Sequence, residues 1–521
     1  MNQYQTFTLC LQGPSLTENW AVPDLKATFT HAGIGTTVEI PGFYDGDGVY
    51  KIRFLPEEPG EYTWDVSGCV NAEGRETCLP ADEHYHGKII TQGISFCHSD
   101  GARYLPFGTT VYALAHQPDE LVAQTLETLE AAPFNKIRMC VFPKHYDYNH
   151  NDPPCFPFEK NEDGGWAVER PSLAFWHRFE HILDKLEEMD IQVDLILFHP
   201  YDCWGFSKMT MARNFIYLET VLRRLAGRPN IWWSMANEYD LLPARKTEDW
   251  YAIEEFIAAH DPFHHLLSNH ACMKAYDFSR PNITHICLQT TWVEKADSYV
   301  QEFGKPVVYD EMCYEGNLVP NWGNLSAFEM VSRFWCVCTK GAYGTHGETF
   351  LAQDDVLWWA KGGVLKGQSP ARIAWLKELL YSLPAPITAN SRMAPPPEML
   401  ANPDAMEKLL ANQPEETRLF ARVMASMPER EREMFFLKNT QYAGHCGEDA
   451  YLWYFAHSCP GQMPLRLPEG KRYRVEVLDA WEMTRTPAGE FDGGAHTIAL
   501  PGKEGIAVLA TYLPKKQEDT K

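Results

Sequence analysis

The chain has 521 residues, 45% hydrophobic and 22% charged, so its composition excludes wholesale disorder and its length predicts two or three domains. Lysine and arginine total 46 against 70 acidic residues, which gives a net charge of -24. Because a phosphate backbone or an anionic bilayer would repel such a surface, we expect neither nucleic acid nor a membrane as partner.

The N-terminus and the cysteines indicate the compartment. The opening stretch MNQYQTFTLCLQG has neither the basic start nor the long apolar core of a secretory signal. No run of about 18 apolar residues predicts a membrane-spanning helix. The 14 cysteines are scattered along the chain, and we interpret them as reduced thiols. A cytoplasmic protein is therefore expected.

Residues 1–95 are predicted to form an N-terminal β-sandwich. Short runs with alternating or aromatic character are separated by the turn signals DGDG and EEPG. These runs are VEIPGF (38–43), YKIRFL (50–55) and EYTWDV (61–66).

Residues 96–385 are predicted to form a (β/α)8 TIM barrel. Eight apolar, strand-like runs alternate with stretches of helical periodicity, and strands that are apolar throughout are typical of a parallel sheet buried on both faces. The strand candidates are 104–114, 135–142, 191–198, 230–236, 265–271, 283–289, 306–311 and 341–348, and the clearest helices are 171–190, 211–227, 247–260 and 369–383. An open doubly wound sheet is the alternative, although no glycine-rich phosphate loop follows the first strand.

The C-terminal part is predicted to hold a linker and a second sandwich. Residues 386–433 begin with a proline-rich stretch and continue as a polar, partly helical segment. Alternation returns at about 434, so residues 434–521 are expected to form a C-terminal β-sandwich. Its strand candidates are EMFFLKN, AYLWYFAH, YRVEVLDAW, HTIALPG and GIAVLATYL.

Two carboxylates follow strands that are not neighbours in the predicted barrel. The fourth strand ends at Asn237-Glu238 and the seventh at Asp310-Glu311, and catalytic groups of barrels lie at such strand ends. Two carboxyls facing each other across a sugar can cut a glycosidic bond, one as proton donor and one as nucleophile. A separation of about 5–5.5 Å gives retention, and about 6.5–9.5 Å gives inversion. Either motif alone would more often be a helix cap or a surface loop, but the two together predict catalysis.

The chain resembles a known clan of enzymes at these positions. The barrel looks like the clan A retaining glycoside hydrolases, which carry the acid/base after an Asn at the end of strand 4 and the nucleophile Glu at the end of strand 7. More narrowly, nearly the whole chain is similar to bacterial cellulase-like or apiosidase-like barrel proteins with a sandwich on each side. The segments that carry this likeness are GFYDGDGVYKIRFLPEEPGEYTW, FNKIRMCVFP, WWSMANEYD and YDE.

The resemblance implies roles for individual residues. Glu238 would be the general acid/base, Glu311 the nucleophile, and Asn237 would bond the sugar 2-OH. Arg138 in strand 2 would keep the nucleophile ionised, because a nearby cation lowers a carboxylate pKa, or it could be part of a structural ion pair. Where the relatives often have Gly-Asp-Thr at the end of strand 1, this chain has Thr109 in place of the Asp.

Further binding candidates follow other strands. His199 ends strand 3 and could contact a sugar hydroxyl or be a structural histidine. Trp292, after strand 6, could stack on a sugar face or belong to the core, and Gln289 is a weaker candidate. His346 and Glu348 follow strand 8 and could select hydroxyls or brace their loop. Rim contacts are weaker candidates still: Lys144, His145, Tyr146, Asp202 and Trp204.

We therefore expect a retaining, exo-acting β-glycosidase that cleaves short oligosaccharides or small glycosides. An inverting glycosidase is one alternative, and a non-catalytic sugar-binding or assembly protein on the same barrel is another. No cofactor and no metal site are expected, because no metal, phosphate or dinucleotide motif is recognisable. The flanking sandwiches could build a homo-oligomer interface.

Overall fold

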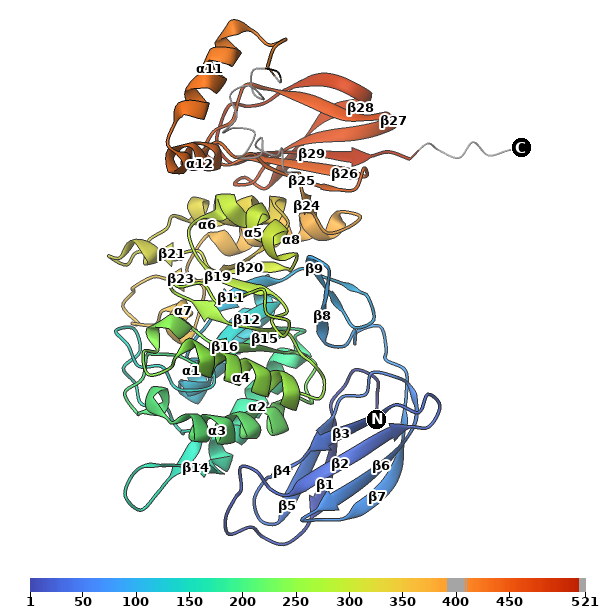
Figure 1. The fold of residues 1–521 in the computed structure, drawn as a ribbon, viewed down its shortest axis with the longest axis vertical. Helices are drawn as coiled ribbons and strands as arrows, with labels where there is room; N and C mark the ends of the chain where they lie inside the picture. The colour runs from blue at the N-terminus through green and yellow to red at the C-terminus, as the bar shows by residue number, and fades with distance from the viewer. Residues whose placement is uncertain (391–407, 409, 515–521) are drawn as a thin grey trace, which may run out of the picture. The chain divides into compact units, whose positions relative to one another are not determined.

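The computed structural model describes residues 1–390, 408 and 410–514. It confirms the predicted fold class, a central parallel barrel with antiparallel sheets in the N-terminal and C-terminal parts of the chain (Figure 1). The chain divides into two compact units. The first comprises Met1–Thr291, Phe303–Met330 and Tyr343–Lys377, and the second Trp292–Glu302, Val331–Ala342 and Glu378–Lys521. Among the described residues, no helix has both the length and the apolar character needed to cross a bilayer.

Two small antiparallel sheets form the N-terminal sandwich. One has the order β1-β5-β4 and the other β3-β2-β6-β7. Phe29 of β2 stacks on Phe54 of β5 with ring centroids 4.2 Å apart, so the two sheets share one core. The strands are β1 Phe7–Gln12, β2 Leu25–His31, β3 Thr37–Pro41, β4 Phe43–Tyr44, β5 Val49–Phe54, β6 Gly60–Gly68 and β7 Ala72–Cys78, followed by a three-stranded sheet of β8 Ile89–Gln92, β9 Ser95–His98 and β10 Arg103–Tyr104.

Buried ion pairs fix this sandwich to two barrel helices. Arg53 of β5 lies 2.6 Å from Glu180 of α2, and Arg224 of α3 lies 2.7 Å from both Glu180 and Asp45. Removing one partner of such a buried cluster leaves an uncompensated charge, at a cost of about 3–5 kcal/mol. The N-terminal sandwich and most of the barrel therefore form one unit.

The barrel has eight strand positions. Its sheet order β17-β16-β15-β12-β11-β22-β20-β19-β18 begins and ends with two fragments of the fifth strand, which close the ring. All eight predicted strands are present. They are β11 Phe107–Thr110, β12 Lys136–Cys140, β15 Gln192–Phe198, β16 Ile231–Ala236, β17 Leu267–Ser268 with β18 His270–Ala271, β19 Ile286–Gln289, β20 Val307–Glu311 and β22 Tyr343–His346. Nearly every residue of these strands is buried, because helices cover the outer face and side chains fill the interior.

The helices alternate with the strands along the chain, except between β18 and β19, where turns replace a helix. The four helices expected from periodicity are confirmed as α2 Leu173–Glu188, α3 Met211–Leu225, α4 Thr247–His260 and α8 Ser369–Ser382. The others are α1 Asp119–Ala131, α5 Ala296–Phe303, α6 Ala327–Thr339 and α7 Trp358–Lys361, and two short strand pairs are added, β13 Phe158–Lys160 with β14 Trp166–Pro171 and β21 Glu315–Gly316 with β23 Glu348–Thr349.

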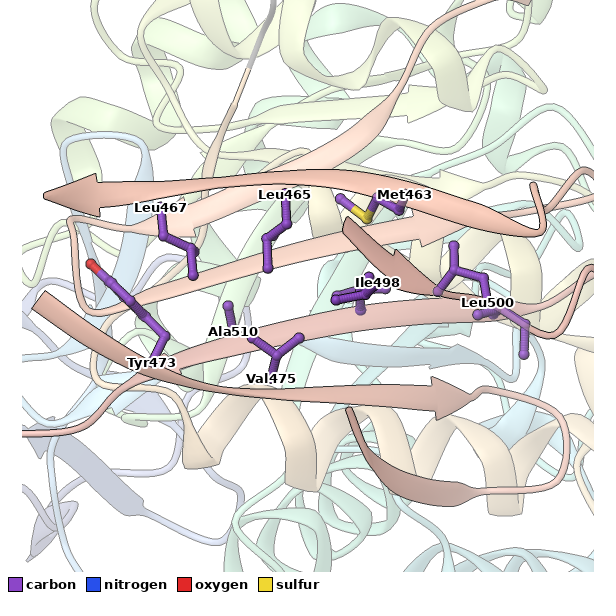
Figure 2. Close-up of a cluster of buried hydrophobic side chains, with 10 residues drawn as sticks. Met463, Leu465, Leu467, Tyr473, Val475, Ile498, Leu500 and Ala510 are labelled. Carbon is purple, nitrogen blue, oxygen red and sulfur yellow. The ribbon is translucent and has the colours of Figure 1, made fainter. Parts of the chain in front are cut away.

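The strands of the C-terminal part are joined into one continuous antiparallel sheet of six strands. Two strands are very long, and an irregularity between Leu467 and Arg472 interrupts the first of them. Both halves of that strand therefore contribute to one core, in which Leu465 faces the layer that carries Val475 (Figure 2). The strands are β24 Thr388–Ala389, β25 Tyr442–Cys446, β26 Ala450–Phe455, β27 Gln462–Asp479, β28 Thr484–Ala499 and β29 Ile506–Tyr512.

One expected strand is a helix. The segment EMFFLKN lies in α12 (Glu429–Lys438), which follows α11 (Glu415–Ser426). Its apolar residues are consecutive rather than alternating, and the charged run before them favours a helix that exposes one face. Part of the expected linker, residues 391–407 and 409, lies outside the described residues, and its first part already pairs with the C-terminal sheet as β24.

Candidate active site

The carboxyl ends of β16 and β20 bring Glu238 and Glu311 into one buried cluster. Glu238 has a φ of 54°, a left-handed conformation that is uncommon for a residue with a side chain. Such backbone strain persists only where neighbouring contacts hold it, and here the Glu238 N–H donates to His270 Nδ1 at 3.2 Å. The orientation of the Glu238 side chain therefore depends on a strained backbone conformation that the hydrogen bond to His270 stabilises.

A short chain of polar contacts connects the two carboxyls. The Tyr112 hydroxyl donates to Glu311 Oε1 and also lies 2.8 Å from Asn237 Oδ1. The Asn237 amide in turn donates to Glu238 Oε2 at 3.1 Å. On the other side, His270 Nε2 lies 3.8 Å from Glu311 Oε1. Residues at or just after the carboxyl ends of strands 1, 4, 5 and 7 thus meet at this end of the barrel.

Glu238 is surrounded by hydrogen-bond donors. The Tyr201 hydroxyl donates to Glu238 Oε2, and Gln289 Nε2 donates to Glu238 Oε1 at 3.1 Å. Burial, followed by the nearby Glu238 charge, raises the pKa of Tyr201 well above its usual range, so this phenol stays a donor. The structure therefore places Gln289 and Asn237 beside the expected acid/base.

Adjacent carboxyls on β20 have opposite environments. Asp310 lies 2.6 Å from Lys136 Nζ and accepts from Thr345 at 3.0 Å. The charges of Lys136 and Arg138 hold its pKa well below the usual range despite burial. Glu311 has a raised pKa because it is buried and because Glu238 is near, although Arg138, 3.7 Å away, opposes the rise.

A bulge explains how both carboxyls reach the same interior. The register between β19 and β20 shifts, so that Leu288 pairs with Tyr309 but Gln289 pairs with Glu311. Such an extra residue breaks the strict alternation of side chains and re-aims the one that follows it. Arg138 lies near three acids. Its Nε is 3.8 Å from Asp310 and 3.3 Å from Asp194, and its Nη1 is 3.7 Å from Glu311. It thus contacts the structural ion cluster and the expected nucleophile at once.

Lys144, which the sequence suggested only as a weak rim contact, is buried among aromatic rings of the site. Its ammonium lies over the rings of Tyr112, Tyr201 and Tyr146 at 3.5, 4.3 and 4.7 Å, and over Trp359 at 5.3 Å. Burial lowers its pKa, and no described residue forms an ion pair or a hydrogen bond with its ammonium. An aromatic cage thus holds a cation whose three N–H donors are left for another acceptor.

His199 and Trp292, two predicted sugar contacts, form none of the hydrogen bonds described above for the carboxyl pair. His199 is buried and its Nε2 lies 3.1 Å from the Phe142 carbonyl, which leaves Nδ1 without a partner, and burial lowers its pKa to about 4. Trp292 is 42% exposed, with Lys295 Nζ 5.8 Å from its ring, and belongs to the second compact unit. Its stacking role stays a prediction.

His346 and Glu348 belong to another cluster, with Glu315. Glu348 accepts from the backbone N–H groups of Lys366 and Gly367 at 2.7 and 2.9 Å. These contacts correspond to the second of the two interpretations, that of a brace for the loop after strand 8.

Three residues of the site were not predicted: Tyr112, Tyr201 and His270. Tyr112 follows β11 by two residues, Tyr201 follows β15 by three, and His270 lies within the interrupted fifth strand. The signal that could have found them is the same strand-end position that identified the carboxyls. Thr109, where relatives often have an acidic residue, accepts a hydrogen bond from Trp358 Nε1 at 2.8 Å. The residue that the chain contributes to the site after strand 1 is Tyr112.

Comparison with known proteins identifies the family of the barrel. Residues 91–381, more than half of the chain, match the family described as apiosidase-like, catalytic domain. The chain belongs to the apiosidase-like family. It is a glycoside hydrolase, as expected from the paired carboxyls. Residues 1–68 and 439–511 match two families described as domains of unknown function, DUF5060 and DUF5605.

Solved structures support the same assignment for this apiosidase-like protein. A candidate glycoside hydrolase from Bacteroides vulgatus ATCC 8482 is 29% identical, with 98% of this chain and 99% of that chain covered and a TM-score of 0.83. A family 5 glycoside hydrolase from the same organism is 15% identical, with 82% and 94% covered and a TM-score of 0.58, which is a likeness of fold. No curated protein matches the sequence.

Proposed function

We propose that this protein is a retaining, exo-acting β-glycosidase with Glu238 as acid/base and Glu311 as nucleophile. The observation that supports this most directly is the polar chain from Glu311 through Tyr112 and Asn237 to Glu238. In a double displacement, Glu311 attacks the anomeric carbon while Glu238 protonates the leaving oxygen, and Glu238 then activates the water that releases the sugar.

The neighbouring side chains favour different roles for Glu311 and Glu238. Arg138 and the Tyr112 hydroxyl stabilise the negative charge that Glu311 needs before attack, against the burial and the Glu238 charge that oppose ionisation. The state that the mechanism requires has one proton on the pair, on Glu238, while Glu311 is ionised.

Asn237 can also bridge the Tyr112 hydroxyl and a protonated Glu238 by hydrogen bonds. The Tyr112 hydroxyl has a single proton, and a carboxylate is a better acceptor than an amide oxygen. With its amide rotated, Asn237 would donate to the Tyr112 oxygen and accept the proton of a protonated Glu238. When a sugar is bound, the same amide would be available for the 2-OH, an interaction that strengthens in the transition state.

Small substrates follow from the depth of the site. Glu238 is only 6% exposed and Glu311 only 8%, which suits the end of a short glycoside better than the interior of a polymer. Lys144 would donate its free N–H groups to substrate oxygens. His199 Nδ1 has no proton when Nε2–H donates to the Phe142 carbonyl, so it would accept from a sugar hydroxyl. None of the 14 cysteines, all of which are described, forms a disulfide, which supports the proposed cytoplasmic location.

A panel of aryl glycosides tests the proposal, with apiosides first because of the family to which the chain belongs. We expect turnover by the wild type, a β-configured product seen first by NMR of a β-glycoside reaction, and loss of turnover in Glu311→Ala. Turnover that survives in Glu311→Ala would refute the assigned nucleophile, and an inverted first product would refute the double displacement.

A further inference from the structure

Three buried side chains meet outside the proposed catalytic pair: Glu315, His346 and Glu348. Each offers one ligand atom, and these atoms all lie within 4.8 Å of one another. Glu315 and Glu348 face each other as register partners in the β21–β23 pair, and His346 is the last residue of β22. All three are at most 2% exposed, so whatever balances their charge must be inside the protein.

The two carboxylates share a cradle of backbone donors. Glu348 accepts from the N–H groups of Lys366 and Gly367, and Glu315 from those of Gln368 and Ser369 at 2.8 and 3.1 Å. Each oxygen therefore takes one N–H and keeps a second lone pair. Among the residues that the structure describes, no Lys or Arg side chain forms an ion pair with either carboxylate. Two buried negative charges without a counter-ion are costly, so a positive occupant is expected.

Gly367 keeps this cradle open. A Cβ at this position would lie 2.5 Å from Glu315 Oε2 and 2.7 Å from Glu348 Oε1. Since real Cβ atoms are essentially never found so close to another heavy atom, only glycine lets the backbone approach both carboxylates. The two acids are thus directed at a common point beside the loop that precedes α8.

His346 supplies the observation that points to a metal. Its Nε2 is completely buried, has no hydrogen-bond partner and lies 3.8 Å from Glu348 Oε1, too far for a hydrogen bond. Its Nδ1 lies 3.1 Å from Thr109 Oγ1, so an Nδ1 proton donated there leaves the Nε2 lone pair directed at the two acids. One ring nitrogen is thus hydrogen-bonded and the other is left for an ion, which is the arrangement that metal-ligating histidines use.

We propose that Glu315, His346 and Glu348 bind one divalent transition-metal ion, of the Zn²⁺ or Mn²⁺ type. One imidazole nitrogen with two carboxylate oxygens is a mixed donor set that suits these ions better than the all-oxygen shells of Ca²⁺ or Mg²⁺. Bonds of about 2.1 Å place ligand atoms at most about 4.2 Å apart, so the three side chains need to close by only a few tenths of an ångström. Water would fill the remaining positions.

The ion would have a structural role. It would tie β22, β21 and the loop before α8 together, and Tyr314, the neighbour of Glu315, packs on Trp359 with ring centroids 5.6 Å apart. Trp359 is part of the aromatic cage around Lys144. The competing occupant is a proton, because burial raises the pKa of Glu348 to about 7. The inference does not depend on the proposed reaction.

Metal binding by the full chain tests the inference. Protein stripped with a chelator is titrated with Mn²⁺, which thiols bind poorly, and bound ion is counted by electron paramagnetic resonance. We expect about one Mn²⁺ per chain and, at a concentration 100 times Kd, a rise in melting temperature of roughly 5 °C. No stoichiometric binding and an unchanged melting temperature with both Mn²⁺ and Zn²⁺ would overturn the metal site in favour of a shared proton.

Variants locate the bound ion. Glu348→Gln and His346→Gln should each weaken Mn²⁺ binding at least about 100-fold, whereas Glu254→Gln, a buried carboxyl bonded to Tyr276, should not. Cys203→Ser, which removes an exposed thiol, controls for adventitious Zn²⁺. If both ligand variants keep wild-type affinity, the site is wrong. If either does not fold, the titration of the wild-type chain still decides.

Discussion

Two pairs of buried carboxyls lie beyond the ends of the barrel strands, and they are satisfied by different donors. Glu238 and Glu311 are held by hydroxyl, amide and guanidinium side chains, whereas Glu315 and Glu348 are held by four successive backbone N–H groups. Side-chain donors can shift their bonds to a substrate as charge develops, whereas backbone donors are fixed. The first pair is therefore suited to chemistry and the second to holding an ion.

The largest expected effect is a difference in kcat/KM between the same Glu-to-Gln substitution made in each of the two pairs. Glu311→Gln removes the nucleophile and should lower kcat/KM by at least about 10⁴-fold with the fold intact. Glu348→Gln should change kcat/KM on the same aryl glycoside by less than about threefold at 25 °C, because it removes no group from the reacting atoms. Steady-state kinetics with circular dichroism on both variants checks this. Equal losses in the two variants would mean that the pairs act as one site.

A smaller effect is expected from the Tyr112 hydroxyl. Tyr112→Phe removes a hydrogen bond to the Glu311 carboxylate, and such charged bonds are worth about 1.5–3 kcal/mol, so kcat/KM should fall about 10–100-fold. Tyr276→Phe is the matched control, since its hydroxyl donates to buried Glu254 at 2.7 Å away from the site. It should lower the melting temperature and leave kcat unchanged. A Tyr112→Phe enzyme with full activity would show that the hydroxyl is only structural.

Lys144→Met should act mainly on binding. Methionine can fill the aromatic cage but has no N–H donors, so we expect KM to rise about 10-fold with a smaller change in kcat. Michaelis–Menten kinetics on the preferred glycoside measures this. If KM does not change, the ammonium serves packing among the rings and does not bind substrate.

The same contrast explains what the sequence could predict. The barrel strands were found because they are buried on both faces and read as continuous apolar runs, and the strand-end rule then identified Glu238 and Glu311. Tyr112 and Tyr201 obey that rule too, but hydroxyl side chains at strand ends are common and carry no charge signal. Gln289 and Asn237 were proposed from position or resemblance, and their contacts with Glu238 appear only in three dimensions.

Other features depend on contacts between distant segments. Glu315 and Glu348 are 33 positions apart and are joined by a two-residue strand pair that no local pattern predicts. The strand predicted at EMFFLKN is wrong, because the apolar residues do not alternate and the charged run before them favours a helix. The two long strands of the C-terminal sheet include irregularities in register, and the sequence predicted only the second part of each, YRVEVLDAW and HTIALPG.

The smallest expected effect is a shift in pH dependence that depends on the closeness of Glu238 and Glu311. The pKa of Glu311 is raised by burial and, secondly, by the Glu238 charge. Ionised Glu311 is the attacking form, so kcat/KM rises as the pH increases through this pKa. Glu238→Gln removes the second cause, the pKa falls, and the acid limb should move to lower pH.

A glycoside with a dinitrophenyl leaving group makes this shift measurable, because it departs without a proton and keeps some activity in Glu238→Gln. Glu348→Gln is the control: it removes a carboxyl from the other pair, which has no part in raising the Glu311 pKa, so its acid limb should coincide with that of the wild type. An unmoved limb in Glu238→Gln would mean that Glu238 has no charge while Glu311 ionises, and would refute the expected contribution of that charge to the Glu311 pKa. The double displacement itself would survive this result, because it needs Glu238 protonated when Glu311 attacks.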